Sequence, residues 1–407
     1  MDVMAPVVLV GGGHAAAAFS NSVRRAGYEG RVVLVSDEPV PPYHRPPLSK
    51  KYLADGLPVE QILIRAPAWY DEQKIELRLG QRAVSVDREA HRLQLANGEA
   101  LDYSRLVLMT GSRPRRLPAA IGGDLQGVLL MRSLADADAL GPHLVAGRRL
   151  LVVGGGYIGL EAAAVAVGKG LQVTLLEAAP RILQRVAAPA TADYFRALHR
   201  GHGVDLREGA GLRQLLADGG RVCGAELDDG SRIEADVVLV GIGVLPNVEL
   251  AQAAGLEVDN GIVVDALCQS SDPHILAAGD CCSFDYQGRR IRLESVQNAN
   301  DQAATAAHTV AGQPKPYAAL PWFWSDQYDC KLQIAGLNSG YDQAVVRPGK
   351  TERSRSVWYY REGRLLAVDA MADAAAFVTA KKLLERGASV PPEQAADPAS
   401  EFRTWGL

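Results

Sequence analysis

The chain has 407 residues, enough for two or three domains that each bury a hydrophobic core. Its net charge of −4 gives no electrostatic reason to expect nucleic acid or a membrane as a partner. The 5 cysteines form no even framework and no C-x-x-C pair, which favours a reducing compartment and predicts a cytoplasmic protein. No stretch is long and apolar enough to predict a membrane-spanning helix.

The N-terminal segment, residues 6–19, reads PVVLVGGGHAAAAF and predicts a strand, a tight turn and a helix rather than a signal peptide. Glycines permit the turn and leave backbone N–H groups unpaired at the helix N-terminus, where a dinucleotide pyrophosphate binds. The pattern is Gly11-x-Gly13-x-x-Ala16, with alanine in place of the third glycine. The next strand ends at Asp37, where a carboxylate accepts hydrogen bonds from a ribose hydroxyl.

The same arrangement recurs in residues 150–177. LLVVGGGYIGLEAAAVA carries Gly154, Gly156 and Gly159 in full register, and the next strand ends at Glu177. Two ordinary βαβ turns with incidental glycines are the alternative. An acidic residue about 20 positions beyond each glycine run favours two dinucleotide sites.

Residues 39–53, PVPPYHRPPLSKKYL, predict a loop stiffened by prolines. The loop places Arg45, Ser49 and Lys50 just after a nucleotide-binding unit, which suggests a site. A plain surface loop fits the composition equally well.

The remaining elements follow from alternating apolar residues and turn signals. Hairpin turns are predicted at Asn97-Gly98 and Asp229-Gly230. An aromatic-rich segment after Pro314 predicts a third, α+β domain, and PPEQAADPASEF at residues 391–402 predicts a loose tail. Buried strands are expected at 106–109, 237–240, 262–264 and 275–278, and helices at 301–311 and 374–386.

Eight motifs in order give the sequence a family resemblance: GGGHAA, RPPLSK, TGSRPR, GGGYIGLEAA, GIGVLPN, AAGD, ESVQNA and PWFWSDQYD. Together they resemble the single-FAD, NADH-dependent ferredoxin reductases of bacterial oxygenase systems, both the putidaredoxin reductase-like type and the reductase components of dioxygenases. The resemblance implies an α/β fold of glutathione-reductase-like architecture, with two Rossmann-like domains and a C-terminal α+β domain. It implies an FAD-binding domain at 1–112 and 242–316, an NADH-binding domain at 113–241 and a C-terminal domain at 317–407.

The resemblance also implies site residues. FAD would be bound by Gly11, Gly13, His14, Ala15, Asp37, Arg45, Lys50, Ala83, Thr110, Gly111, Arg132, Gly279, Asp280, Val296, Gln297 and Trp324. NAD would be bound by Gly154, Gly156, Tyr157, Ile158, Gly159, Glu161, Glu177 and Gly243. No metal site is expected. Plainer interpretations stay open for three residues: His14 as a solvated turn residue, Trp324 as a core aromatic and Glu161 as a helix-capping carboxylate.

Lys50 and Glu161 are the catalytic pair that the resemblance implies. The lysine would stabilise negative charge on the reduced flavin, and the pair would align the nicotinamide. Glu177 predicts a preference for NADH, since a carboxylate repels the 2′-phosphate of NADPH, although Arg181 lies four positions later and would soften it.

The route by which electrons leave the flavin follows from the cysteines. Reductases of this plan that act on disulfides need a cysteine pair, typically C-x-x-x-x-C, and the sequence has no such spacing. Electrons must therefore leave the flavin directly and singly, and the family's acceptor is an acidic two-iron, two-sulfur ferredoxin. Basic residues for docking it are Arg289, Arg290 and Arg292, with Arg347 and Lys350 as further candidates, and a solvated face is the alternative.

Two functions remain in play from the sequence. The first is electron transfer from NADH to a ferredoxin, or to a rubredoxin, feeding a haem-thiolate monooxygenase or a ring-hydroxylating dioxygenase. The second is an NADH-sensing flavoprotein of the apoptosis-inducing factor type, which acts by binding partners. We expect a monomer or weak dimer, without nucleic acid or membrane as a partner.

Overall fold

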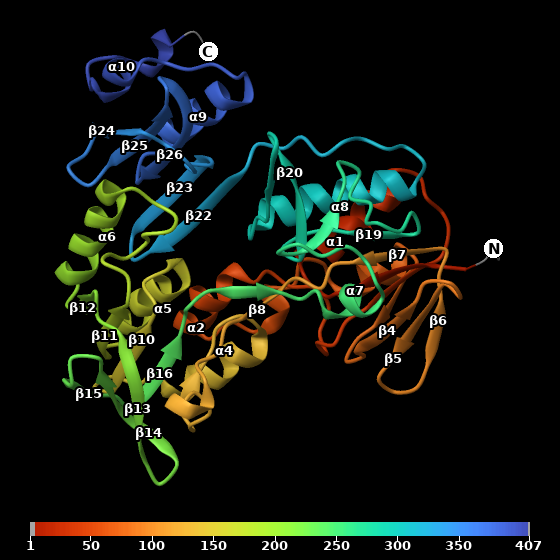
Figure 1. Cartoon of the computed structure of the whole chain (residues 1–407), viewed down its shortest axis with the longest axis horizontal. Coiled ribbons are helices and arrows are strands. Elements are labelled where there is room, and N and C mark those ends of the chain that lie inside the picture. Colours follow the sequence, from red (N-terminus) through yellow and green to blue (C-terminus); the bar gives the residue numbers. More distant parts are fainter. Residues whose placement is uncertain (1–4, 406–407) are drawn as a thin grey trace. The chain divides into compact units, whose positions relative to one another are not determined.

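The computed structural model describes residues 5–405, which form two compact units (Figure 1). Unit 1 contains the chain up to Arg45, Leu57–Arg113 and Val244–Ala319. Unit 2 contains Pro46–Gly56, Pro114–Gly243 and the chain from Leu320 onward. The division into three domains with the boundaries given above stays a prediction.

Unit 1 is built on a parallel five-stranded sheet in the order β19-β7-β1-β2-β3. Helices α1 and α8 cover one face, where their alanines pack on Val7 and Leu9 of β1. The opposite face packs against the β4–β6 hairpin strands and β20. The sheet strands are β1 (Val7–Val10), β2 (Val32–Val35), β3 (Ile75–Arg78), β7 (Arg105–Leu108) and β19 (Ile275–Ala277), and the two helices are α1 (His14–Arg25) and α8 (Val296–Val310).

Smaller elements complete unit 1. An antiparallel sheet contains β4 (Ala83–Asp87), β5 (Arg92–Leu95) and β6 (Ala100–Asp102), and a mixed sheet contains β18 (Ile262–Val264), β20 (Cys282–Tyr286) and β21 (Arg289–Ile291). Strands β8 (Ser112–Pro114) and β17 (Val244–Pro246) pair with each other. The short helices are α3 (Pro67–Glu72) and α7 (Glu249–Ala253).

Unit 2 contains a second parallel sheet, in the order β12-β11-β10-β16-β9. Its strands are β9 (Val128–Leu129), β10 (Arg149–Val153), β11 (Gln172–Glu177), β12 (Asp205–Glu208) and β16 (Val237–Val240). The helices are α2 (Lys51–Asp55), α4 (Leu134–Leu140), α5 (Tyr157–Gly168) and α6 (Pro189–Gly201), and an antiparallel sheet holds β13 (Leu212–Asp218), β14 (Arg221–Leu227) and β15 (Arg232–Glu234).

The C-terminal part of unit 2 is an antiparallel sheet in the order β22-β23-β26-β25-β24, covered by α9. Alternate buried residues such as Trp358, Tyr360 and Val368 form its core with Phe377 of α9. The elements are β22 (Trp322–Gln327), β23 (Cys330–Gly336), β24 (Gln343–Pro348), β25 (Arg355–Arg361), β26 (Arg364–Met371), α9 (Ala374–Glu385) and α10 (Pro392–Ala396).

Two local predictions are wrong. Residues 391–402 are not a loose tail, because α10 forms there, and Ala395 and Trp405 are buried against the C-terminal sheet. The proline-rich segment 39–53 is not all loop, because Pro46–Ser49 form a 3₁₀ turn that leads into α2. Among residues 5–405, none of the helices combines the length and apolar character needed to cross a membrane.

Candidate active site

The first glycine loop joins β1 to α1 in unit 1. Gly11 has φ +131°, and a Cβ there would lie 2.1 Å from the carbonyl oxygen of Met109, so only glycine fits. Gly13 is the N-cap of α1, and no side chain caps the helix. His14 and Ala15, the next two residues, are buried in its first turn. The loop therefore presents a helix N-terminus without an acidic neighbour in its first turn, which suits an anion.

A half-buried arginine, Arg45, lies beside this loop. A Cβ on Gly13 would lie 3.9 Å from Nε of Arg45. The guanidinium donates to Oε1 of Glu38 at 2.5 Å and to the hydroxyl of Tyr43 at 3.0 Å. Burial disfavours its charged form, but the electrostatic interactions with Tyr43, Glu38 and Asp280 and the hydrogen bond to Glu38 outweigh that effect and raise the pKa of Arg45. Arg45 is thus a fixed cation beside the helix N-terminus.

The ends of β7 and β19 bring further predicted residues to the same edge of the sheet. Gly279 has φ +90°, and a Cβ there would lie 3.5 Å from Ala15 and from Ala299 of α8. Asp280, the next residue, accepts from the Ser112 hydroxyl at 3.0 Å. Val296 and Gln297 form the first turn of α8, which Ser295 caps through the amide of Asn298. The carboxyl ends of parallel strands are where coenzymes bind.

Asn247 is a residue of this edge that sequence reasoning missed. The side-chain amide of Asn247 donates to the backbone carbonyl of Thr110 at 2.8 Å. The backbone carbonyl of Asn247 accepts from the Thr110 hydroxyl at 2.6 Å. Its backbone amide donates to the carbonyl of Gly111 at 2.9 Å. Three hydrogen bonds thus hold the Thr110-Gly111 turn, and the signal was the asparagine that ends the GIGVLPN motif.

The second glycine loop, between β10 and α5 in unit 2, repeats the geometry of the first. Gly154 has φ +114°, and a Cβ there would lie 2.4 Å from the carbonyl oxygen of Gly241. A Cβ on Gly159 would lie 2.2 Å from the carbonyl oxygen of Gly154, so the helix packs closely on the loop. Gly156 is the N-cap of α5, which has no side-chain cap. Unit 2 therefore has its own uncapped helix N-terminus at the carboxyl end of a parallel sheet.

Glu177, the last residue of β11, bonds back to this loop. Oε2 accepts from the Gly155 amide at 2.7 Å, and Oε1 accepts from the Ala179 amide at 2.8 Å. Two oxygens offer about four acceptor positions, so the carboxylate retains capacity for a ribose hydroxyl. The guanidinium of Arg181 donates to backbone carbonyls, among them that of Ala187 at 2.8 Å.

The predicted catalytic pair is formed within unit 2. Nζ of Lys50 lies 2.6 Å from Oε2 of Glu161, and the glutamate side chain is only 3% exposed. The hydroxyl of Ser49 donates to the same oxygen at 2.8 Å, and the hydroxyl of Ser325 donates to Oε1 at 2.7 Å. Glu161 lies on α5 and is bonded by three side chains, so it does not act as a simple helix cap.

The other predicted residues are distributed over both units. In unit 1, Asp37 is exposed just beyond β2, and Ala83 begins β4. In unit 2, the backbone amide of Arg132 donates to Asp136 at 3.0 Å, and Gly243 has φ +98° near Arg185. Also in unit 2, Trp324 is half-buried on β22, Ile158 is 43% exposed and Tyr157 packs on Phe323 with ring centroids 5.0 Å apart.

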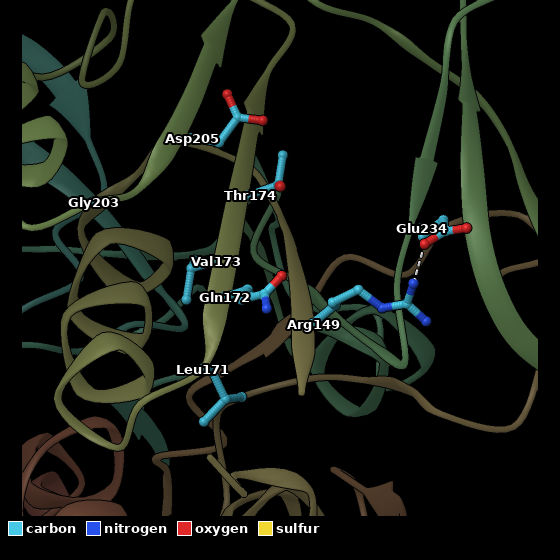
Figure 2. A pocket seen from close by; sticks show the side chains of 8 residues that line it. All are labelled: Arg149, Leu171, Gln172, Val173, Thr174, Gly203, Asp205 and Glu234. Atoms are coloured by element: carbon cyan, nitrogen blue, oxygen red, sulfur yellow. Dashed lines mark hydrogen bonds and ion pairs between the residues drawn. The ribbon is translucent and has the colours of Figure 1, made fainter. Parts of the chain in front are cut away.

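A hollow of about 430 Å³ in unit 2 contains none of these residues (Figure 2). It is lined by the first residues of β10, β11 and β12, among them Arg149, Gln172 and Asp205. This is the amino end of the parallel sheet, opposite to the edge where coenzymes bind. We assign it no role in the site.

The predicted docking arginines differ in their availability. Arg289 and Arg290 are exposed on β21. The side chain of Arg292 is only 11% exposed and lies 2.6 Å from Glu294, so it is the weakest member of the set. Arg347 is buried and donates to the carbonyls of the C-terminal segment, which removes it from any exposed docking face.

Comparison with known proteins gives the family. Residues 5–303 match the model of the pyridine nucleotide-disulphide oxidoreductase family, and residues 322–405 match the reductase C-terminal family. The chain belongs to the pyridine nucleotide-disulphide oxidoreductases. This family match spans both glycine loops, so the predicted family and α/β fold are confirmed.

Sequence similarity to known relatives covers nearly the whole length of this oxidoreductase. Putidaredoxin reductase of Pseudomonas putida is 43% identical over 96% of this chain and 94% of that protein. The ferredoxin–NAD⁺ reductase component of the anthranilate 1,2-dioxygenase system of Burkholderia cepacia is 43% identical, covering 98% of this chain and 99% of that protein. The crystal structure of the covalent putidaredoxin reductase–putidaredoxin complex matches with TM-score 0.95 and 42% identity over 98% of this chain and 97% of that one.

Both glycine loops have features that suit the binding of a dinucleotide. At Gly11 and Gly154 a Cβ would overlap backbone, and the helices that follow have uncapped N-termini. Arg45 adds a cation beside the first loop, and Glu177 adds an acceptor beside the second. These features fit one dinucleotide in each unit.

Proposed function

We propose that the chain is an FAD-dependent NADH:ferredoxin oxidoreductase that serves an oxygenase. It would take electrons from NADH and pass them singly to a two-iron, two-sulfur ferredoxin, which would supply a haem-thiolate monooxygenase or a ring-hydroxylating dioxygenase. The observation that carries the proposal is that each unit has a glycine turn followed by a helix whose N-terminus has no side-chain cap. The sequence also has no cysteine pair with the spacing of a dithiol relay. The relatives that match over 94% or more of their length support the choice of ferredoxin.

We assign the roles of the two sites as follows. Gly11, Gly13 and Arg45 would hold the pyrophosphate of FAD in unit 1, and Gly154, Gly156 and Glu177 would hold NADH in unit 2. FAD supplies the conversion of a hydride pair into single electrons. The Lys50 ammonium, fixed by Glu161 at 2.6 Å, would supply positive charge toward the reduced coenzyme.

Location and thiol state are part of the proposal. Of the cysteines, Cys223 is exposed, and Cys268, Cys281, Cys282 and Cys330 are buried, all as free thiols. Burial raises the pKa of Cys282 and Cys330, so these thiols stay protonated and unreactive. Free thiols suit a reducing compartment, which supports a cytoplasmic protein.

The experiment is a steady-state assay of the purified flavoprotein with NADH, a two-iron ferredoxin and cytochrome c as final acceptor. We expect turnover that depends on the ferredoxin and is faster with it than with a rubredoxin. A rubredoxin reductase of Pseudomonas putida is 38% identical over 89% of this chain, so rubredoxin is the necessary comparison. Slow reduction by NADH and no acceleration by either carrier would instead favour the partner-binding flavoprotein.

A further inference from the structure

A chain of buried hydrogen bonds ends on Glu161, on the carboxylate oxygen that Lys50 does not contact. Oε1 accepts from the hydroxyl of Ser325 at 2.7 Å, and Oγ of Ser325 accepts from Nε2 of Gln327 at 3.2 Å. Oε1 of Gln327 lies 2.8 Å from Nε2 of His199, and Nδ1 of His199 lies 3.2 Å from the hydroxyl of Tyr328. The chain therefore joins α5, β22 and α6, all within unit 2.

Each hydrogen bond in this chain has a fixed direction. A carboxylate only accepts, so Ser325 donates to it, and the Ser325 oxygen is left to accept an N–H of Gln327. The amide oxygen of Gln327 then faces His199, so Nε2 of the imidazole must carry the proton. Burial lowers the pKa of His199 to about 4, which keeps the ring neutral and leaves Nδ1 to accept from Tyr328. Every donor points along the chain toward Glu161.

Burial makes the chain rigid. Ser325, Gln327 and His199 are each 0% exposed. A buried polar group without a partner is costly, so each member fixes the orientation of the next. Gln327 also determines what the chain does, because a carboxamide is neither protonated nor deprotonated at neutral pH and so cannot pass a proton along. The chain orients a carboxylate and does not carry protons.

We propose that Ser325, Gln327 and His199 are positioning residues that hold Glu161 in the orientation in which Oε2 receives Lys50 and Ser49. The inference rests on the proposed function, because it assigns the chain to the pair that acts in flavin reduction. Without the chain, Oε1 of Glu161 loses its donor, and only the contacts of Oε2 with Lys50 and Ser49 orient the carboxylate, so the Lys50–Glu161 pair is held less firmly.

The test uses the oxidised holoprotein and compares Ser325→Ala and Gln327→Met with Ser356→Ala. Ser356 is a matched control, since it is 0% exposed in the same sheet and its hydroxyl accepts from the Trp358 indole at 3.0 Å, without contact to Glu161. The first readout is acylation of Lys50 by acetic anhydride without NADH, measured by mass spectrometry of the peptide. The second is the rate of flavin reduction at saturating NADH.

We expect Ser325→Ala and Gln327→Met to raise the acylation rate of Lys50 at least threefold and to slow flavin reduction at least fivefold. Ser325→Thr, which keeps the hydroxyl, should restore both values, and Ser356→Ala should leave both unchanged. If Ser325→Ala does not fold, Gln327→Met and Ser325→Thr carry the comparison.

The outcomes separate the two proposals. A wild-type protein that NADH does not reduce overturns the proposed function, while the acylation of Lys50 still decides the positioning role. A wild-type protein that NADH reduces, with Ser325→Ala and Gln327→Met equal to Ser356→Ala in both readouts, overturns the positioning role alone.

Discussion

Oε2 of Glu177 accepts a hydrogen bond from the backbone amide of Gly155, with the nitrogen and oxygen 2.7 Å apart. This bond connects the end of β11 to the glycine loop that precedes α5. The bond fixes a negative charge where the adenosine ribose of a dinucleotide binds. Arg181 lies four positions after Glu177, and its guanidinium donates to the backbone carbonyls of Ala187 at 2.8 Å and Gln184 at 3.4 Å.

This relationship predicts that NADH is preferred over NADPH. The specificity constant, kcat/KM, should be at least about tenfold higher for NADH, which corresponds to about 1.4 kcal/mol of transition-state free energy. Glu177→Gln keeps one acceptor oxygen for the loop and removes the charge, so it should narrow the ratio mainly by improving NADPH. Equal specificity constants for the two coenzymes in the wild-type protein would contradict the assignment.

Lys50→Ala should slow flavin reduction by NADH without unfolding the protein. A preorganised charge of this kind is worth a few kcal/mol, so the rate measured by stopped flow should fall by about 10- to 100-fold. Lys51→Ala is the control, because Lys51 is the exposed neighbour on α2.

A loss of stability in Lys50→Ala would have a specific cause, the unpaired charge of the buried Glu161. Lys50→Ala combined with Glu161→Gln removes that charge and should recover the melting temperature while the reduction stays slow. An unchanged reduction rate in Lys50→Ala would rule out the catalytic role of the pair.

Asp369 predicts a pH dependence of stability. The carboxyl group is buried on β26, where Thr191 donates to it at 2.7 Å and the Tyr359 hydroxyl also donates. Burial raises its pKa to about 6, against these two donors. The folded protein then holds a proton that the unfolded chain has lost between about pH 4 and pH 6, so this group's contribution to stability falls as the pH rises through that window.

Asp369→Asn keeps an acceptor for both donors and cannot ionise. The free energy of unfolding of this variant, relative to wild type, should therefore rise by about 2 to 3 kcal/mol between pH 4 and pH 7. The comparison with wild type is essential, since the lowered pKa of His199 makes its own contribution fall with decreasing pH over the same range. The measurement is a denaturant titration of both proteins at each pH. The same difference in free energy of unfolding between Asp369→Asn and wild type at pH 4 and at pH 7 would contradict the raised pKa of Asp369.

Electrostatic steering predicts that ferredoxin reduction slows with added salt. Raising the ionic strength from about 0.01 M to 0.1 M shortens the Debye length from about 30 Å to about 10 Å, which weakens attraction to an acidic partner. Combined Arg289→Ala and Arg290→Ala should lower the rate at low salt and flatten its salt dependence. Arg232→Ala is the control, because its side chain is 70% exposed on β15 and Arg232 is not among the predicted docking residues. Equal salt dependence in the two variants would remove the β21 arginines from the docking surface.

The sequence predicted most accurately what is determined locally. Residues 237–240 are the strand β16 as predicted, and both glycine turns lie where the motifs placed them, since four apolar residues followed by glycines permit few alternatives. Helix α8 begins at Val296, five residues before the predicted start, because Ser295 caps it. A serine at position 295 is the sequence signal for a helix that begins at the next residue.

Sequence patterns do not predict which side chains from distant segments of the chain contact each other. His199 and Gln327 meet across 128 positions of the chain, and no spacing in the sequence indicates that an α6 histidine faces a β22 glutamine. The C-terminal segment was predicted loose from its polar composition. It is ordered because the buried Arg347 donates to the carbonyls of Asp397 and Ser400 and its guanidinium lies 5.4 Å from the Trp405 ring centroid.

The central claim is that FAD receives electrons from NADH in a chain without a sulfur relay. The most direct measurement is an anaerobic titration of the yellow protein with NADH, followed by the flavin absorbance. The account predicts one FAD per chain, fully bleached by one equivalent of NADH. A colourless protein that takes up no FAD, or one that needs a second equivalent because a disulfide takes two further electrons, would contradict it.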